Sequence, residues 1–281
     1  MQARVAICVV YLVDDAFDFL LEAHLAQIKR CSGDIPLRIY AGINRLAPRY
    51  LEQLKQHDFI TICDLPDTDA RGSFEHAFYL DRLIGRAIRG GASHICTLDV
   101  DSFPISSDWL SAPLAALEKG SSLVGILRRE NGDFAAPHPS FMLFPTAFLT
   151  EYRPTFSPLA NNQAAIAFSD RTGQRLDTGA GYALVLDRYQ LPWTKMLRSN
   201  VRDLHPLLGG IYDGRIFHFG GGNRDKVFTV DVREARRMRP SAEIGELWPE
   251  IAARNHQIAL DMLSAMRSDL DGFMRHLQTG D

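Results

Sequence analysis

Residues 94–101 read HICTLDVD, an apolar run that ends in two aspartates separated by one residue. The run from His94 to Val100 has the length and apolar content of a buried strand, so Asp99 and Asp101 are expected at its exit. Two carboxylates at a strand exit can share a divalent cation and a ribose, and Mg²⁺ and Mn²⁺ prefer carboxylate oxygens. The alternative is a solvated strand end that caps the next helix, because D-x-D is common by chance.

The residues before this run alternate between strand-like and helical patterns. Strand-like runs are expected at 5–13, 37–43 and 59–65, and segments with helical spacing at 16–29, 48–56 and 74–89. This alternation predicts an α/β protein with a mostly parallel central sheet covered by helices on both faces. Ligands bind such sheets beyond the carboxyl ends of the strands, where Asp14, Asp64 and Asp99 are all expected.

The pattern is looser after residue 108. The expected elements are a helix at 110–119, strands at 123–127, 140–144 and 215–219, a polar loop at 128–139, a turn and helix at 177–189, and a C-terminal helical tract at 242–277 with a break near Asn255.

The segments around the aspartate pair resemble the donor half of glycosyltransferases with the GT-A fold. They are Gly72–His76, Leu80–Arg82 and His94–Asp101. In that fold, which is Rossmann-like, a helix with small and polar residues precedes the strand that carries the D-x-D motif. The resemblance implies a nucleoside-diphosphate-sugar donor and a divalent metal, Mn²⁺ or Mg²⁺. It covers residues 1–105 well and the rest weakly.

The same resemblance assigns roles to individual residues. It implies that Asp101 binds the metal directly and that Asp99 contacts the ribose or a metal-bound water. It also places Asp64 near the nucleobase, the loop around Asp14 beside the nucleotide, and His76 in the donor site. A metal held there would neutralise the diphosphate and help it depart.

A second candidate motif is FHFGGGN at residues 217–223. Metal-dependent GT-A enzymes often supply a late histidine as a third protein ligand, and His218 matches that role, since neutral imidazole is a suitable ligand for Mn²⁺. Glycines such as Gly221 would let backbone N–H groups approach the phosphates, and Arg224 and Lys226 could add positive charge. The alternative is a histidine in an edge strand followed by a flexible turn.

A third motif is LDTGAG at residues 176–181. Sugar transfer with inversion needs a carboxylate to deprotonate the acceptor hydroxyl, and Asp177 is the candidate base. Glu130 and Asp133, in the polar loop, are alternative bases. Asp177 could instead cap the following helix. The D-T-G-A tetrapeptide also resembles the active-site loop of retropepsin-like aspartic proteases, but those enzymes are all-β and need two such aspartates.

We therefore expect three parts: a nucleotide-sugar-binding half at 1–105, an acceptor half at 106–235 that closes the metal site, and C-terminal helices at 236–281 that cover the sheet or support self-association.

The predicted activity is transfer of a sugar to a hydroxyl of a glycan or lipid-linked acceptor, as in polysaccharide biosynthesis. A nucleotidyltransferase, a haloacid-dehalogenase-like phosphatase and a non-catalytic nucleotide- or carbohydrate-binding module remain as alternatives. Residues 13–16 read VDDA and lack the glycine-rich basic loop of a nucleotidyltransferase. No late acidic pair supports a haloacid-dehalogenase-like phosphatase.

Composition sets the remaining expectations. A formal charge of −3 gives no reason to expect nucleic-acid binding. The four cysteines form no C-x-x-C pair and are expected as buried thiols in a reducing compartment, the cytoplasm. The apolar run at 5–13 is too short to span a bilayer. Four arginines could contact an anionic membrane surface or an acidic acceptor, or could form a solvated turn: Arg233, Arg236, Arg237 and Arg239.

Overall fold

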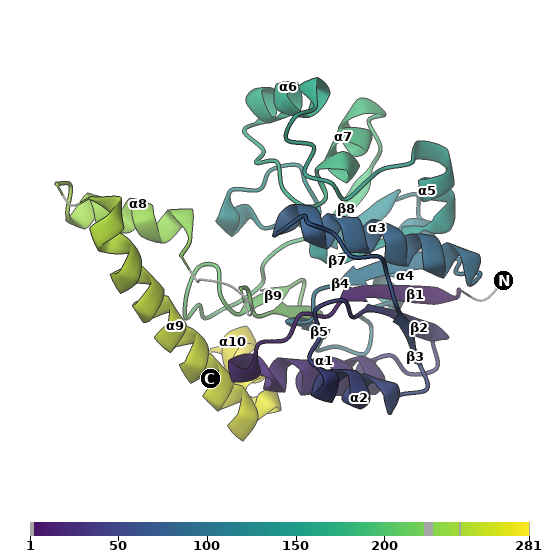
Figure 1. Ribbon diagram of the computed structural model, residues 1–281, viewed down its shortest axis with the longest axis horizontal. Helices are drawn as coiled ribbons and strands as arrows, with labels where there is room; N and C mark the ends of the chain where they lie inside the picture. Colours follow the sequence, from purple (N-terminus) through teal and green to yellow (C-terminus); the bar gives the residue numbers. More distant parts are fainter. Residues whose placement is uncertain (1–2, 222–226, 242, 281) are drawn as a thin grey trace.

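The computed structural model describes residues 3–221, 227–241 and 243–280 (Figure 1). The alternation predicted for the first hundred residues is present. Its elements are β1 (Val5–Val10), the 3₁₀ helix η1 (Asp15–Phe17), α1 (Phe19–Cys31), β2 (Leu37–Gly42), α2 (Pro48–Lys55), β3 (Ile60–Cys63), α3 (Ser73–Arg89) and β4 (His94–Leu98).

The second half contains shorter elements. They are β5 (Ser102–Pro104), α4 (Ser111–Glu118), β6 (Leu123–Ile126), the 3₁₀ helix η2 (Arg129–Asn131), β7 (His138–Pro145), α5 (Thr146–Tyr152), α6 (Gln163–Thr172), α7 (Ala180–Arg188), β8 (Trp193–Met196), β9 (Gly210–Tyr212), β10 (Ile216–His218), α8 (Thr229–Met238), α9 (Ile244–Ser268) and α10 (Leu270–Thr279).

The central sheet has seven strands in the order β3-β2-β1-β4-β7-β6-β8. Pairing is parallel except at β7, which runs antiparallel to β4 and β6. The strand order reverses direction at β1, because β2 lies on one side of it and β4 on the other. The carboxyl ends of β1 and β4 therefore lie side by side, at the type of switch point where open α/β sheets bind ligands.

Helices cover both faces of this sheet, and successive residues of β1 show why. Ile7 packs in a core with α1 and α2, whereas Cys8 packs in a second core with α3, α5 and α7. Figure 1 shows α1 and α2 on one side of the strands and α3, α5 and α7 on the other. An apolar strand buried on both faces is typical of parallel sheets, and the predicted α/β class is confirmed.

A second, three-stranded antiparallel sheet in the order β5-β10-β9 lies beside the first. It has its own core, in which Phe103, Phe217 and Phe219 pack against Met262 of α9 and Leu277 of α10. β5 follows β4 after a short turn, so the two sheets meet at the aspartate pair. The C-terminal helices thus cover the small sheet and α1 rather than the outer faces of the large one (Figure 1).

The expected helix break near Asn255 is wrong. Asn255 is fully buried inside α9, and its Nδ2 donates a hydrogen bond of 2.8 Å to Asp231 Oδ2 of α8, so a polar residue here does not end the helix. The break falls at Asp269, whose carboxylate accepts from the Gly272 backbone N–H at 2.8 Å and so starts α10.

All four cysteines are buried and free, as expected. None of the described helices is long and apolar enough to cross a membrane.

Candidate active site

The turn between β4 and β5 carries the aspartate pair. β4 ends at Leu98, and the Ser102 backbone N–H donates to the Asp99 carbonyl oxygen at 2.9 Å, which closes the turn. Asp101 is 7% exposed, and Asp99 is half-buried at the cavity wall. The expected position of these carboxylates, at a strand exit beside the switch point of the sheet, is therefore the observed one.

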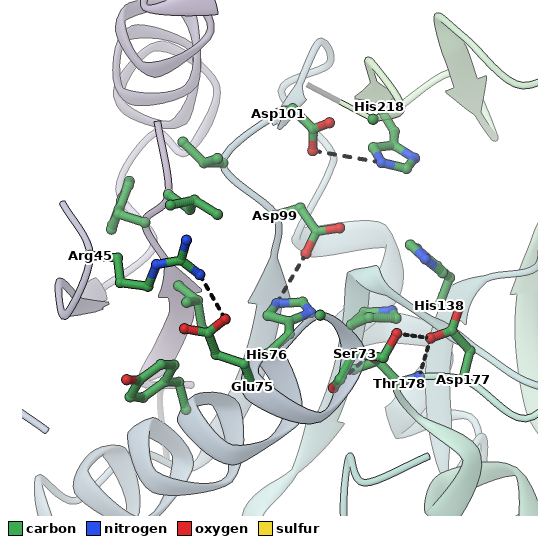
Figure 2. A pocket seen from close by; sticks show the side chains of 18 of the residues that line it. Arg45, Ser73, Glu75, His76, Asp99, Asp101, His138, Asp177, Thr178 and His218 are labelled. Atoms are coloured by element: carbon green, nitrogen blue, oxygen red, sulfur yellow. Dashed lines mark hydrogen bonds and ion pairs between the residues drawn. The ribbon is translucent and has the colours of Figure 1, made fainter. Parts of the chain in front are cut away.

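His218 reaches this turn through the small sheet. β10 pairs antiparallel with β5, which puts His218 opposite Ser102, and the Phe219 backbone N–H donates to the Asp101 carbonyl oxygen at 2.8 Å. His218 Nε2 then lies 3.6 Å from Asp101 Oδ1 (Figure 2). One ligand atom each from Asp99, Asp101 and His218 lie within 4.8 Å of one another. Two carboxylates and an imidazole suit Mn²⁺, so the donor set fits the expected cation.

The first turn of α3 forms the adjoining wall. Gly72 has a φ of 60°, in the region that favours glycine, and the helix begins at the next residue. His76 Nε2 lies 3.5 Å from Asp99 Oδ1, and both side chains are partly buried (Figure 2). The positive end of the α3 dipole faces the same space, which favours an anion there.

Asp177 lies in the cavity beside the N-terminus of α3. Its Oδ1 accepts from Ser73 Oγ at 2.5 Å and from the Thr178 backbone N–H at 2.8 Å (Figure 2). The helix that follows, α7, has Gly179 at its N-cap and no side-chain cap, so Asp177 does not cap it. The carboxylate is thus held in the cavity by Ser73, the first residue of α3.

These side chains line one cavity beyond the ends of β1 and β4. Five residues that the sequence singled out are among its lining: His76, Asp99, Asp101, Asp177 and His218. Gly221 lines it too, with a φ of 77°, where its backbone can approach a ligand. Lys226, which we expected near the phosphates, lies outside the described residues, and so does Arg224.

Two aspartates that the resemblance placed near the nucleotide do not line this cavity as far as the structure describes it. Asp14 Oδ1 accepts from the Ala16 backbone N–H at 2.9 Å and caps the short η1 helix. Asp64 is exposed just after β3, and its carbonyl oxygen accepts from Arg86 at 3.5 Å. Contacts of either residue with a nucleotide stay predictions.

A second cavity adjoins the first and shares Arg128 and Asp177 with it. Its other described lining mixes cationic, acidic and apolar groups, including Glu130, Arg175, Leu207, Phe228, Val232, Ile244 and Trp248. Ile244 is 42% exposed and Trp248 is 44% exposed, so apolar surface of α9 is available to a ligand. Asp177 therefore stands where the two cavities meet.

The polar loop at 128–137 forms one wall of this second cavity, and it is more ordered than the sequence indicated. Arg128 Nε lies 3.3 Å from Asp133 Oδ2, and Tyr212 donates to Glu130 Oε1 at 2.5 Å. Burial, followed by the charge of Glu130, raises the pKa of Tyr212, so the phenol stays protonated. Glu130 and Asp133, the alternative bases, are thus both engaged in structural bonds.

His138 is a cavity residue whose place beside the candidate metal ligands the sequence did not show. Its ring centroid lies 5.5 Å from that of His218, and its Nδ1 accepts from the Ser140 backbone N–H at 3.2 Å. In the neutral ring the proton is then on Nε2. The residue starts β7, the antiparallel neighbour of β4, and a single sequence carries no signal for that non-local pairing.

Comparisons with known proteins identify the fold. No protein-family model and no curated protein matches the chain. Among solved structures, the mannosyltransferase PcManGT from Pyrobaculum calidifontis, in complex with GDP-Man and Mn²⁺, matches with a TM-score of 0.51 and 13% identity, over 94% of this chain and 74% of that one. At this identity the likeness concerns the fold, which is GT-A-like as the resemblance predicted.

Two further solved structures match with TM-scores below 0.5. Mouse xyloside xylosyltransferase 1 in its apo form has a TM-score of 0.43 and 11% identity, over 70% of this chain and 85% of that one. Residues 1–349 of S. aureus TarS have a TM-score of 0.44 and 11% identity, over 69% of this chain and 58% of that one.

Proposed function

We propose that this chain is a metal-dependent glycosyltransferase that moves a sugar from a nucleoside diphosphate sugar to an acceptor hydroxyl. The observation that carries the proposal is the convergence of Asp99, Asp101 and His218 at the ends of β1 and β4. The GT-A-like fold supports it, because the matching PcManGT structure holds GDP-Man and Mn²⁺.

In this proposal, Asp101 and His218 hold the cation, and Asp99 contacts it or the ribose. The cation, Mn²⁺ or Mg²⁺, supplies positive charge that stabilises the departing diphosphate. The α3 N-terminus and the Gly221 backbone add favourable dipoles in the same place. His76, at 3.5 Å from Asp99, positions that carboxylate.

Asp177 is proposed as the base that takes the proton of the acceptor hydroxyl. Its place at the junction of the two cavities supports this role, because donor and acceptor must meet where the proton is removed. The hydrogen bond from Ser73 fixes the carboxylate against α3. A single base and direct attack give inversion at the anomeric carbon.

The second cavity is the proposed acceptor site. Arg128 and Arg175 supply positive charge there, and Trp248 and Ile244 supply apolar surface, which suits a glycan or a lipid-linked acceptor.

Residues 1–105 would then bind the nucleotide sugar, residues 106–235 the acceptor, and residues 236–281 would support the small sheet. Cytoplasmic location, contact of α8 with the inner face of a membrane, and self-association belong to the same hypothesis.

The test is turnover of a panel of nucleotide sugars with and without Mn²⁺. The native chain should release nucleoside diphosphate only with the metal, and Asp101→Ala should abolish this release while circular dichroism shows an intact fold. Asp58→Ala, at an exposed position outside the cavity, is the matched control. Full activity of Asp101→Ala, or release of pyrophosphate in place of nucleoside diphosphate, would exclude the proposed reaction.

A further inference from the structure

An ion pair lies on the cavity wall beside α3, away from His218. Arg45, just after β2, donates from Nη1 to Oε2 of Glu75, in the first turn of α3, at 2.9 Å (Figure 2). The Glu75 side chain is 11% exposed, whereas that of Arg45 is 52% exposed. Both residues line the cavity. A carboxylate so deeply buried is costly unless its oxygens are hydrogen-bonded.

The ion pair uses only part of the hydrogen-bonding capacity of the Glu75 carboxylate. Within the described chain, Oε2 accepts from Arg45, and no hydrogen bond to Oε1 is formed. Tyr79 lies one turn further along α3 and also lines the cavity. Glu75 and Tyr79 are four residues apart in the helix, so their side chains lie on the same face. Burial and then the negative charge of Glu75 raise the pKa of Tyr79. The wall therefore presents a donor, the guanidinium, next to an acceptor with unused capacity.

The position of the pair indicates what it meets. Glu75 and His76 are consecutive in α3, and His76 contacts Asp99, so the cavity passes from the metal residues to Asp99 and then to the pair (Figure 2). A nucleoside diphosphate has the same order: diphosphate, ribose, base. If the diphosphate lies at the metal, as the proposed function requires, the base reaches Arg45 and Glu75.

We propose that Arg45 and Glu75 select guanine, so that the donor is a guanosine diphosphate sugar. This inference rests on the proposed function. The Watson–Crick edge of guanine presents an acceptor, O6, beside two adjacent donors, N1–H and N2–H. Arg45 can donate to O6 while the carboxylate of Glu75 accepts from both N–H groups, a pairing of edge and side chain that discriminates well between bases.

The other common bases leave part of this wall unmatched. Uracil presents N3–H between two carbonyl oxygens, so its O2 would face a carboxylate oxygen at the position where guanine offers N2–H. Adenine and cytosine each present one amino group beside a ring nitrogen acceptor, so they offer only one donor group to Glu75. A buried polar group without a partner lowers the affinity for the nucleotide. Loss of one hydrogen bond to a charged group lowers that affinity by roughly tenfold or more.

The experiment is calorimetric titration of the full chain with GDP, inosine diphosphate, UDP, ADP and CDP, all with Mn²⁺. GDP should bind at least about tenfold more tightly than UDP, ADP or CDP. Inosine diphosphate, which lacks only the N2 amino group, should bind more weakly than GDP by several-fold. This comparison needs no variant, so it does not depend on how a substitution affects folding.

A variant then assigns the preference to Glu75. Glu75→Gln replaces one acceptor oxygen by a donor, so GDP affinity should fall at least about tenfold while UDP affinity stays or rises. Glu52→Gln, on the exposed face of α2, is the matched control and should leave all affinities unchanged. Equal weakening of every nucleotide would show that Glu75 only supports the wall and would overturn the inference.

The remaining outcomes separate this inference from the proposed function. Metal-dependent binding with a preference for UDP, ADP or CDP would overturn guanine selection and leave the glycosyltransferase proposal intact. Equal binding of GDP and inosine diphosphate would also overturn it. Failure of every nucleoside diphosphate to bind with Mn²⁺ would overturn both.

Discussion

Phe219 donates its backbone N–H to the carbonyl oxygen of Asp101 at 2.8 Å, which joins the end of β10 to the turn after β4. This bond holds the His218 imidazole beside the Asp101 carboxylate although the two residues are far apart in the chain. The candidate metal site thus depends on the pairing of the small sheet as much as on the D-x-D motif.

Removal of the imidazole should weaken metal binding. We expect His218→Ala to lower Mn²⁺ affinity by roughly tenfold to a hundredfold or more, because one of three protein ligands is lost while both carboxylates stay. Calorimetric titration with Mn²⁺ alone measures this. His256→Ala, on the exposed side of α9, should bind the ion like the native chain. Unchanged affinity in His218→Ala would remove His218 from the site.

Asp177→Asn should separate donor binding from transfer. The amide keeps an oxygen that can accept from Ser73 but cannot take a proton from an acceptor, so transfer should fall by roughly 10²- to 10⁴-fold with donor affinity unchanged. Calorimetry measures binding, and product analysis measures transfer. Asp170→Asn, exposed on α6, is the control. A normal transfer rate in Asp177→Asn would show that another group is the base.

Stability should depend on pH through His24. This imidazole is fully buried: its Nδ1 donates to the Ser102 carbonyl oxygen at 2.7 Å, and its Nε2 lies 3.2 Å from the Tyr11 hydroxyl. Burial lowers the pKa of His24 to about 4, only partly opposed by the bond to Ser102 and by the charge of Asp101. Between pH 6.5 and 4 the unfolded chain therefore binds a proton that the folded chain does not.

Acid should therefore destabilise the folded chain through His24. The contribution of His24, on the order of 3 kcal/mol, is fully present above pH 6.5 and is lost as the pH falls toward 4. Urea unfolding at pH 7, 6 and 5 measures it. His24→Asn keeps a donor for Ser102 without a titrating ring, so its unfolding free energy should fall less steeply with acid. An equal slope in both proteins would exclude His24 as the cause.

Two glycines should respond oppositely to alanine. A Cβ on Gly181 of α7 would lie 2.3 Å from the Thr155 carbonyl oxygen, and Thr155 is itself held by a bond of 2.6 Å to Asp81. We expect Gly181→Ala to destabilise the fold by about 1–3 kcal/mol. Gly245 in α9 has open space around it, so Gly245→Ala should be neutral or stabilise by up to about 1 kcal/mol.

Thermal and urea unfolding measure both changes. Because α7 follows Asp177 directly, Gly181→Ala should also reduce transfer more than its loss of stability explains. A Gly181→Ala variant as stable as the native chain would show that α7 and the segment at Thr155 can move apart freely.

The first hundred residues could be predicted because their signals are local. Runs such as Val5–Val10 are apolar throughout since both faces of the strand are buried, and the intervening helices carry their own periodicity. The second half lacks such signals. β8 reads WTKM with one fully buried residue, and β5, β9 and β10 have only three residues each, so pairing rather than pattern defines them.

The candidate site follows the same division. Asp99 and Asp101 could be placed because a strand exit is visible in the sequence. His138 could not be placed beside His218, because that proximity arises from the antiparallel pairing of β7 with β4. Arg45 and Glu75 come from the ends of separate elements, and only the parallel pairing of β2 with β1 and the packing of α3 bring them together.

Phe217 and Phe219, on either side of His218, are buried against α9 and α10. A ligand that binds the folded small sheet stabilises everything packed on it, and the converse holds equally. If Mn²⁺ binds as proposed, it should therefore also stabilise α9 and α10, which supply none of the three candidate ligands. Amide protons along α9 should consequently exchange more slowly when Mn²⁺ is added, and deletion of α10 should weaken Mn²⁺ binding.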